Sequence, residues 1–219
     1  MPKPTFFNLS DKKRQNITDL AIAEFANADY NSVSISNIVK QAKIAKGSFY
    51  QYFEDKQDLY MHIVSLAYER RIAFVQTAQQ ALQKEPKDFF ETLRQLFRVS
   101  VQFSFQQPQL AQIINRAAYD DSPVRETVSQ QARAIAQRYI YELVKKGIAD
   151  GDLHPTISPD LATFVIVTTA DSLKYYIPQQ LKIDTQKLAT AADTSADMQL
   201  VEQIFDELVQ VFKRGMAQA

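Results

Sequence analysis

The stretch that decides the fold runs from Ser32 to Leu59 and reads SVSISNIVKQAKIAKGSFYQYFEDKQDL. Its first part predicts a short amphipathic helix, because apolar residues recur every three or four positions, at Ile35, Ile38, Val39 and Ala42. Ser34 stands just before this helix as an N-cap. A second short helix is expected from Ala45 to Tyr52. Two short helices joined by such a turn form a helix-turn-helix, whose second helix enters the major groove of DNA.

The outward face of the second helix has the chemistry that DNA contact requires. Gly47 has no side chain, so the backbone there can approach a base edge or a phosphate closely. Lys46 supplies a cation and a donor for guanine acceptors, and the hydroxyls of Ser48 and Tyr50 can bond to bases or phosphates. A face used only for packing would carry apolar residues at these positions. The alternative is an ordinary solvated helix surface.

The residues that follow indicate the start of a third helix in this region. Asp55 and Asp58 form an acidic cap for it, which suits the positive end of a helix. Lys56 lies in its first turn, where unpaired backbone amides can also hold a phosphate.

The run from Ala42 to Leu59 resembles the signature of the TetR family of transcriptional regulators, in the spacing of its aromatic residues, glycine and lysine. The resemblance covers about 50 residues at the N-terminus. Lys43 replaces the glycine usual in the turn, so we expect it to adopt a left-handed conformation with modest strain. Ala45 replaces the usual Ser or Thr, and the loss of such a cap typically costs about 1 kcal/mol.

The resemblance implies a function and a set of contacts. We expect a homodimeric repressor that binds palindromic double-stranded DNA and is released by a small-molecule effector. Lys46 and Ser48 are expected to contact bases, and Tyr50, Tyr52 and Lys56 to contact phosphates. The complete expected DNA-binding set is Ser34, Lys43, Lys46, Gly47, Ser48, Tyr50, Tyr52 and Lys56.

Composition limits the other classes of function. The 219 residues include no cysteine, which excludes disulfides and thiolate metal sites. The net charge is zero, but residues 1–56 carry eight Lys and Arg against six Asp and Glu, so the basic balance is local. No 18-residue apolar run predicts a membrane span, and the N-terminus lacks the apolar core of a signal peptide. We therefore expect a cytoplasmic protein with no membrane partner.

The rest of the chain predicts an all-α fold, because long stretches follow a 3.6-residue period. We expect a three-helix helix-turn-helix domain over residues 1–56 and a larger helical regulatory and dimerisation domain over residues 57–219. Met1 to Leu9 forms an arm, which Phe6, Phe7 and Leu9 are expected to hold against the first helix. Between the two domains, one helix from Asp55 to about Lys84 is continuous.

Two C-terminal helices carry more apolar surface than one subunit can cover. Helix 159–176 is apolar almost all round, with Pro178 expected to end it, and helix 198–215 has a wide stripe that includes Phe205 and Leu208. We expect both to pack against a second copy of the chain. Packing within one chain is the alternative. Residues 179–197 form a polar connection between these helices.

Aromatic residues are dense in the middle of the chain, where they can line a cavity for an apolar or aromatic effector. Our candidates for effector contacts are Phe97, Phe103, Tyr119 and Tyr139. A well-filled core is the alternative for each of them.

The sequence does not predict an enzyme. His62 and His154 lie far apart, and no phosphate-binding loop, nucleophile elbow or metal-binding helix motif is present. We expect no catalytic residues, no metal and no cofactor. The alternative function is a helical protein- or lipid-binding module without a DNA function, in which the outward face of the second helix would be apolar.

Overall fold

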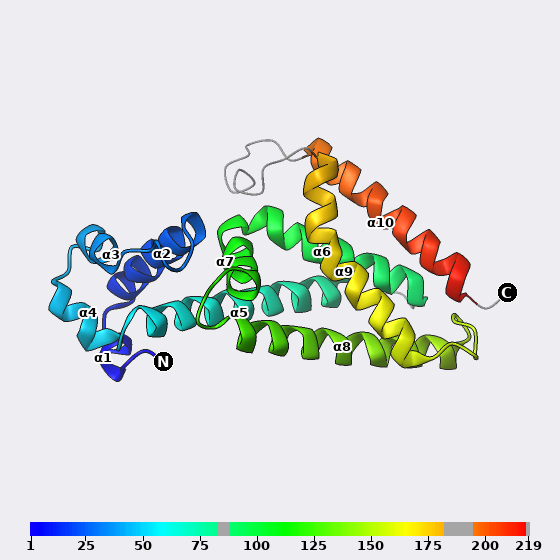
Figure 1. Ribbon diagram of the computed structural model, residues 1–219, viewed down its shortest axis with the longest axis horizontal. Helices are drawn as coiled ribbons and strands as arrows, with labels where there is room; N and C mark the ends of the chain where they lie inside the picture. Colours follow the sequence, from blue (N-terminus) through cyan, green and yellow to red (C-terminus); the bar gives the residue numbers. More distant parts are fainter. Residues whose placement is uncertain (83–87, 182–194, 218–219) are drawn as a thin grey trace. The chain divides into compact units, whose positions relative to one another are not determined.

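The computed structural model describes residues 1–82, 88–181 and 195–217. These residues form helices and one isolated bridge between Leu153 and Ala217 (Figure 1), so the predicted all-α class is confirmed. The chain divides into two compact units. The first unit comprises residues 1–74 and 107–129, and the second comprises residues 75–106 and 130–219. The two units are defined by which residues pack together, and they do not test where the DNA-binding domain ends. The expected domain boundary after residue 56 therefore stays a prediction.

The first unit is built around α2. This helix packs on α3 and α7, while α1 and α3 each pack on α4. The bounds are α1 Pro4–Phe7, α2 Asp11–Asn27, α3 Ile35–Gln41, α4 Lys46–Tyr52, α5 Lys56–Leu82 and α7 Pro108–Tyr119. Large side chains that are almost fully buried fill its interior, among them Ile17, Phe25, Ile38, Phe49, Phe53, Leu59 and Ile63.

The predicted acidic cap of α5 is confirmed. The backbone N–H of Asp58 donates to the Asp55 carboxylate over 2.8 Å, and the N–H of Glu54 donates to the Asp58 carboxylate over 3.0 Å. One of the unpaired amides at this helix start, that of Asp58, is therefore satisfied by a side chain, and the Asp58 carboxylate holds the chain just before the helix. The cap fixes where α5 begins, directly after the helix-turn-helix.

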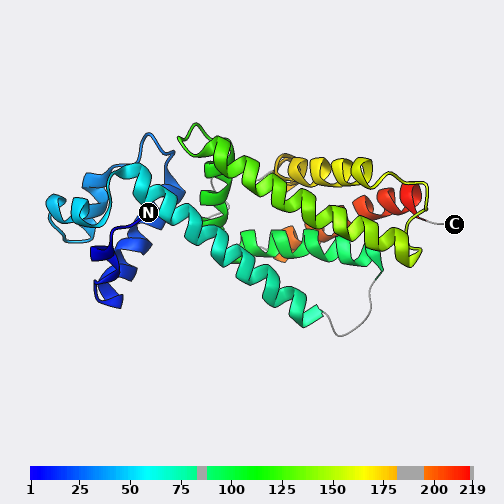
Figure 2. The same ribbon diagram turned by 90° about the horizontal axis from the view of Figure 1, so that it is seen from below.

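The second unit contains α6 (Phe89–Gln106), α9 (Pro159–Leu181), α10 (Ser195–Met216) and most of α8 (Arg125–Asp150). In it, α10 packs on α6 and α9 (Figure 2). The rings of Phe97 and Phe205 stack with centroids 5.6 Å apart. An ion pair of 2.8 Å joins Arg98 to Glu202, and a two-pronged one joins Arg94 to Asp206.

One glycine follows the end of α8, and another lies where α8 packs closely against α6. Gly151 has a φ of 85° and follows the last residue of the helix, the usual place of a left-handed glycine. Gly147 lies where a Cβ would come within 2.9 Å of the Phe89 ring and 3.2 Å of Leu153. Only a residue without a side chain lets α8 approach α6 this closely.

Some expectations for the second unit are wrong. Helix α9 continues past Pro178 to Leu181. A proline removes one N–H from the helix and crowds the carbonyl four residues earlier, but so close to the end of a helix it disturbs only the last turn. The expected start of α10 at Met198 is three residues late. Most of the expected connection, residues 182–194, lies outside the described residues.

Candidate nucleic-acid interface

Helices α3 and α4 and the turn between them form the predicted helix-turn-helix. Helix α3 ends as the Ala42 N–H donates to the Ile38 carbonyl over 2.9 Å. Lys43 then adopts a φ of 54°, the left-handed conformation expected where the family usually has glycine. Its neighbour Ile44 donates back to the Val39 carbonyl over 3.1 Å. The chain thereby reverses within four residues and can begin α4 at Lys46.

Helix α4 has one buried and one exposed face. Phe49 and Tyr52 are buried, and the opposite face exposes Lys46, Gly47 and Tyr50, while Ser48 is partly buried. Apart from its two chain neighbours and the backbone of its own helix, no heavy atom of the described chain lies within 4 Å of the place where a Cβ on Gly47 would be. Nothing in the described fold therefore requires a glycine at this position. Its surface is open to a molecule from outside.

Ser34 and Lys43 lie outside α4 but within the same helix-turn-helix. Both are exposed, at the N-cap of α3 and in the turn respectively. Within the described structure the Ser34 side chain makes no capping hydrogen bond, contrary to its expected role as a side-chain cap. Ala45, at the N-cap of α4, likewise caps nothing, as its identity predicts.

Two residues of the expected DNA-binding set have other partners. The Lys56 ammonium donates to the carbonyls of Tyr30, Asn31 and Val33 over 2.9, 3.2 and 3.2 Å. It also lies 4.6 Å from the centre of the Tyr30 ring. An ammonium has three donors, and all three are occupied here. Tyr52 is 7% exposed, with its ring 6.2 Å from that of Phe6. We therefore leave both side chains out of the proposed DNA contacts.

Burial shifts the pKa values of two groups next to the helix-turn-helix, Tyr60 and His62. Burial, aided by the Asp120 carboxylate, raises the pKa of Tyr60 far above its usual value. Burial also lowers the pKa of His62, against the opposing effect of Glu69 and Asp58. Burial thus favours the neutral form of both groups. The described residues contain no cluster of three His, Asp or Glu side chains suited to a metal ion.

The N-terminal arm lies in a place that the sequence did not predict. Its helix α1 packs on α4, with Phe6 1% exposed and Phe7 53% exposed. The expected link to the first long helix is made instead by Arg14 of α2, which donates to the Phe7 carbonyl over 3.0 Å. The sequence offered one signal, a proline at the first position of α1 followed by an aromatic pair. That signal predicts a short helix but does not say which surface it covers.

The four candidate effector residues do not form one described site. Phe97 and Phe103 are buried in α6. Tyr139 is exposed on α8, and Tyr119 belongs to the other compact unit. Their role as effector contacts remains a prediction.

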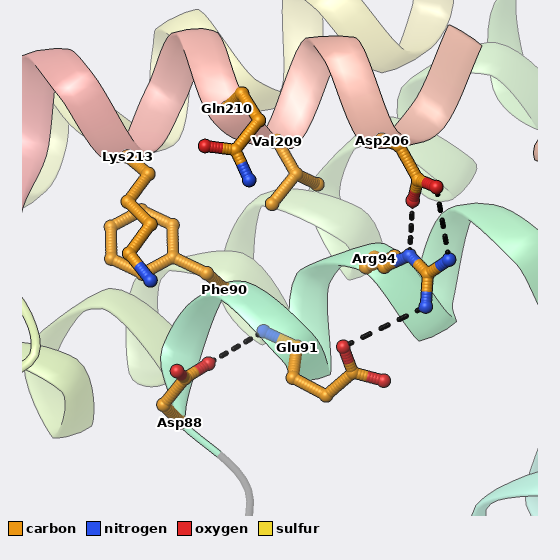
Figure 3. Close-up of a pocket in the computed structure, with 8 residues that line it drawn as sticks. All are labelled: Asp88, Phe90, Glu91, Arg94, Asp206, Val209, Gln210 and Lys213. Atoms are coloured by element: carbon orange, nitrogen blue, oxygen red, sulfur yellow. Dashed lines mark hydrogen bonds and ion pairs between the residues drawn. The ribbon is translucent and has the colours of Figure 1, made fainter. Parts of the chain in front are cut away.

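An open pocket of about 350 Å³ lies elsewhere, between α6 and α10 (Figure 3). Arg94 at its edge is held by the carboxylates of Asp206 and Glu91. Lys213 lies 5.8 Å above the ring of Phe90. None of the four candidate effector residues is among its lining residues, which are Asp88, Phe90, Glu91, Arg94, Asp206, Val209, Gln210 and Lys213.

Comparison with known proteins identifies the fold as that of a protein family. A family model described as "Bacterial regulatory proteins, tetR family" matches residues 17–63, and one described as "Tetracyclin repressor-like, C-terminal domain" matches residues 87–217. The chain belongs to the TetR family. A crystal structure of a TetR family transcriptional regulator from Chloroflexus aurantiacus J-10-FL is 36% identical, with 100% of both chains covered and a TM-score of 0.79.

Curated relatives of this TetR-family protein are also regulators. AcrR from Shigella flexneri is 33% identical over 87 residues, which is 40% of this chain and 39% of AcrR. The fatty acid metabolism regulator protein of Bacillus subtilis (strain 168) is 28% identical over 165 residues, covering 73% of this chain and 80% of its own. The chain spans between 20% and 39% of the first two curated relatives that it matches.

No helix in the described part of this TetR-family chain combines the length and the apolar composition needed to cross a membrane.

Proposed function

We propose that this protein is a homodimeric, ligand-responsive repressor that reads a palindromic operator with helix α4 of each subunit. The observation that carries the proposal is the exposed face of α4, where Gly47 leaves an open surface between Lys46 and Tyr50. Two such helices, related by a twofold axis, would enter successive major grooves on one side of the duplex. A palindromic site follows from that symmetry.

The contacts divide by chemistry. Lys46 and Ser48 lie at the start of α4 and are assigned to base edges, where lysine prefers guanine acceptors. Ser34, Lys43 and Tyr50 are exposed on the same helix-turn-helix and are assigned to phosphates. Gly47 allows the helix backbone to come close to the DNA. The set is small, which suits the nearly balanced charge of residues 1–56.

The test is DNA selection from a random-sequence pool by the unchanged protein, repeated with Lys46→Ala. Without the Lys46 side chain, the base preference at one position of each half-site should become weaker, while the base preferences at the other positions stay the same. Lys145→Ala is the matched control, because Lys145 is an exposed lysine on α8, outside the helix-turn-helix. If the unchanged protein enriches no palindrome, the proposed operator reading is wrong.

The dimer is proposed on the surface of α9. Leu161, Phe164 and Tyr175 are each exposed by about 60%, and they share one face with the exposed Thr168 and Ser172. The other face of α9 is buried in the core of its own unit through Ala162, Ile166 and Val167. A helix that is apolar on both sides needs a partner on its outer side as well. Phe205, expected at this interface, is instead buried against Phe97.

The effector is proposed to be apolar, with a fatty acid as the first probe. Support comes from the aromatic residues of α6 and from the curated relative that regulates fatty acid metabolism. Phe97, Phe103, Tyr119 and Tyr139 remain the candidate contacts. We place the protein in the cytoplasm, where its DNA is, and assign it no catalytic step.

A further inference from the structure

Recognition helix α4 is short and lacks the usual means of closing its own ends. It has seven residues, and Ala45 at its N-cap offers no side-chain oxygen. At the other end Phe53 is extended, with a φ of −131° and a ψ of 148°, so the chain leaves the helix directly. The last four carbonyls of a helix have no partner within it, and a helix this short is marginal by itself.

The N-terminal arm supplies the missing partners. The Lys3 backbone N–H donates to the Tyr52 carbonyl over 2.8 Å, and the Lys3 ammonium donates to the Tyr50 carbonyl over 3.0 Å. The hydroxyl of Thr5 donates to the Gln51 carbonyl. The remaining carbonyl, that of Phe49, accepts from the N–H of Phe53 over 2.9 Å. All four terminal carbonyls of α4 are thereby satisfied, three of them by the arm.

Packing fixes the arm at this position. The buried ring of Phe6 lies 4.8 Å from that of Phe53 and 5.5 Å from that of His62, measured between centroids. Lys3 also forms an ion pair of 2.8 Å with Glu54, just beyond the end of α4. The arm therefore contacts both the end of α4 and the first turns of α5.

We propose that residues 2–7 of the arm form the C-terminal cap of the recognition helix, and that Thr5 and Lys3 are positioning residues for operator reading. They act through α4, without a required contact to DNA. The proposal rests on the proposed function in one respect, that α4 reads bases. If the cap is lost, α4 frays, and only the fraction of molecules with an intact helix can read the groove.

Thr5→Val is the central variant, because it removes the donor to Gln51 without changing shape or charge. Hydrogen exchange of the α4 amides should become faster, and affinity for a duplex selected by the unchanged protein should fall by about two- to fivefold, in keeping with the loss of one hydrogen bond. Binding to a scrambled duplex of the same length should change less, since it depends mainly on phosphates. Thr5→Ser keeps the hydroxyl and should restore both quantities.

Thr92→Val is the matched control. The Thr92 hydroxyl donates to the Asp88 carbonyl over 3.0 Å on α6, so its loss should leave α4 exchange and DNA binding unchanged. The salt dependence of binding should stay the same for Thr5→Val, because no charge is removed.

Each other outcome contradicts the proposal. If Thr5→Val weakens binding without changing hydrogen exchange in α4, Thr5 contacts DNA directly. If exchange becomes faster but the ratio of affinities for the selected and the scrambled duplex stays the same, the cap does not contribute to sequence recognition. No change in either quantity would show that the arm is not a cap. If the unchanged protein selects no duplex, the proposed function fails, while the exchange data still decide whether the arm caps α4.

Discussion

Two glycines within helices, Gly47 and Gly147, have different surroundings. Substitutions at these two positions should therefore distinguish an effect on DNA binding from an effect on folding. Around Gly47 a Cβ would meet nothing within 4 Å, whereas at Gly147 it would meet Phe89 at 2.9 Å. Alanine in a helix is favoured over glycine by up to about 1 kcal/mol. We therefore expect Gly47→Ala to leave the thermal unfolding temperature unchanged or slightly higher, while weakening DNA binding through a methyl group at the contact surface.

Gly147→Ala provides the contrast for that experiment. The added methyl group overlaps the Phe89 ring, and overpacking of this kind costs typically about 1–3 kcal/mol. The unfolding temperature of Gly147→Ala should therefore fall.

Fluorescence anisotropy measures the effect of Gly47→Ala on DNA binding. If Gly47→Ala binds DNA as tightly as the unchanged protein, the open surface at Gly47 is not the contact surface.

Lys56 has a structural role that a substitution can test. We expect Lys56→Met to lower the free energy of unfolding by about 1–3 kcal/mol, because three backbone carbonyls lose a charged donor. Urea unfolding measures this change. The slope of DNA affinity against salt should stay the same, since the ammonium is engaged within the fold. A slope lower by about one unit would instead identify Lys56 as a phosphate contact.

His62 should make stability depend on pH. Burial lowers its pKa in the folded state below the usual value of about 6.5, so the unfolded chain binds its proton more readily. Stability from this group is complete above pH 6.5 and decreases as the pH falls below it, because protonation favours the unfolded state. Urea midpoints measured between pH 7.5 and 5 should therefore decrease, and His62→Gln should reduce that decrease. An unchanged pH profile in His62→Gln would contradict this assignment.

At the scale of elements, α9 provides the test of the proposed dimer. Changing both Leu161 and Phe164 to Glu should give folded monomers, because these side chains are exposed in a single subunit and have no core to disrupt. Sedimentation velocity distinguishes the monomer from the dimer, and circular dichroism checks that the helices are kept.

The control for α9 is Ile135→Glu, which changes an apolar side chain of similar exposure on α8 and should leave the dimer intact. Phe205→Glu would be uninformative, since Phe205 is buried in the core and its loss would unfold the second unit. If the unchanged protein sediments as a monomer at micromolar concentration, the proposed dimer is wrong.

The same elements show what the sequence could predict. The cap at Asp55 and Asp58 and the helix end at Gly151 were predictable, because each depends on neighbouring residues. Lys56 was not, because its carbonyl partners lie 23 to 26 positions away in the sequence. The exposed residues of α4 could be predicted from the helical period. Tyr52 is covered by Phe6 of the N-terminal arm, and nothing in the sequence indicated that the arm would pack on α4. Contacts between distant segments were thus the unpredictable part.

At the scale of the whole molecule, regulation requires that effector and operator compete. Helix α5 is one continuous element of 27 residues that starts beside the helix-turn-helix and belongs to both units. We expect an effector to shift it and to lower operator affinity by roughly 5- to 150-fold, the usual range of about 1–3 kcal/mol for such coupling. By reciprocity, operator DNA must weaken effector binding by the same factor.

Calorimetric titration with palmitate, in the presence and absence of the selected duplex, measures that coupling. The dissociation constant should be higher with DNA present. Equal dissociation constants would show that palmitate binds without regulating. Absence of binding would exclude this fatty acid and require another apolar probe.

The first unit is assembled from two separate parts of the chain, residues 1–74 and 107–129, with α7 packed on α2. A ribosome makes roughly 5–20 residues per second and releases the N-terminus first. The helix-turn-helix must therefore wait, with the α2 surface that α7 will cover still open, until α7 has been made. A nascent chain stalled before Pro108 should expose that apolar surface to chaperones, although it already contains every residue assigned to DNA.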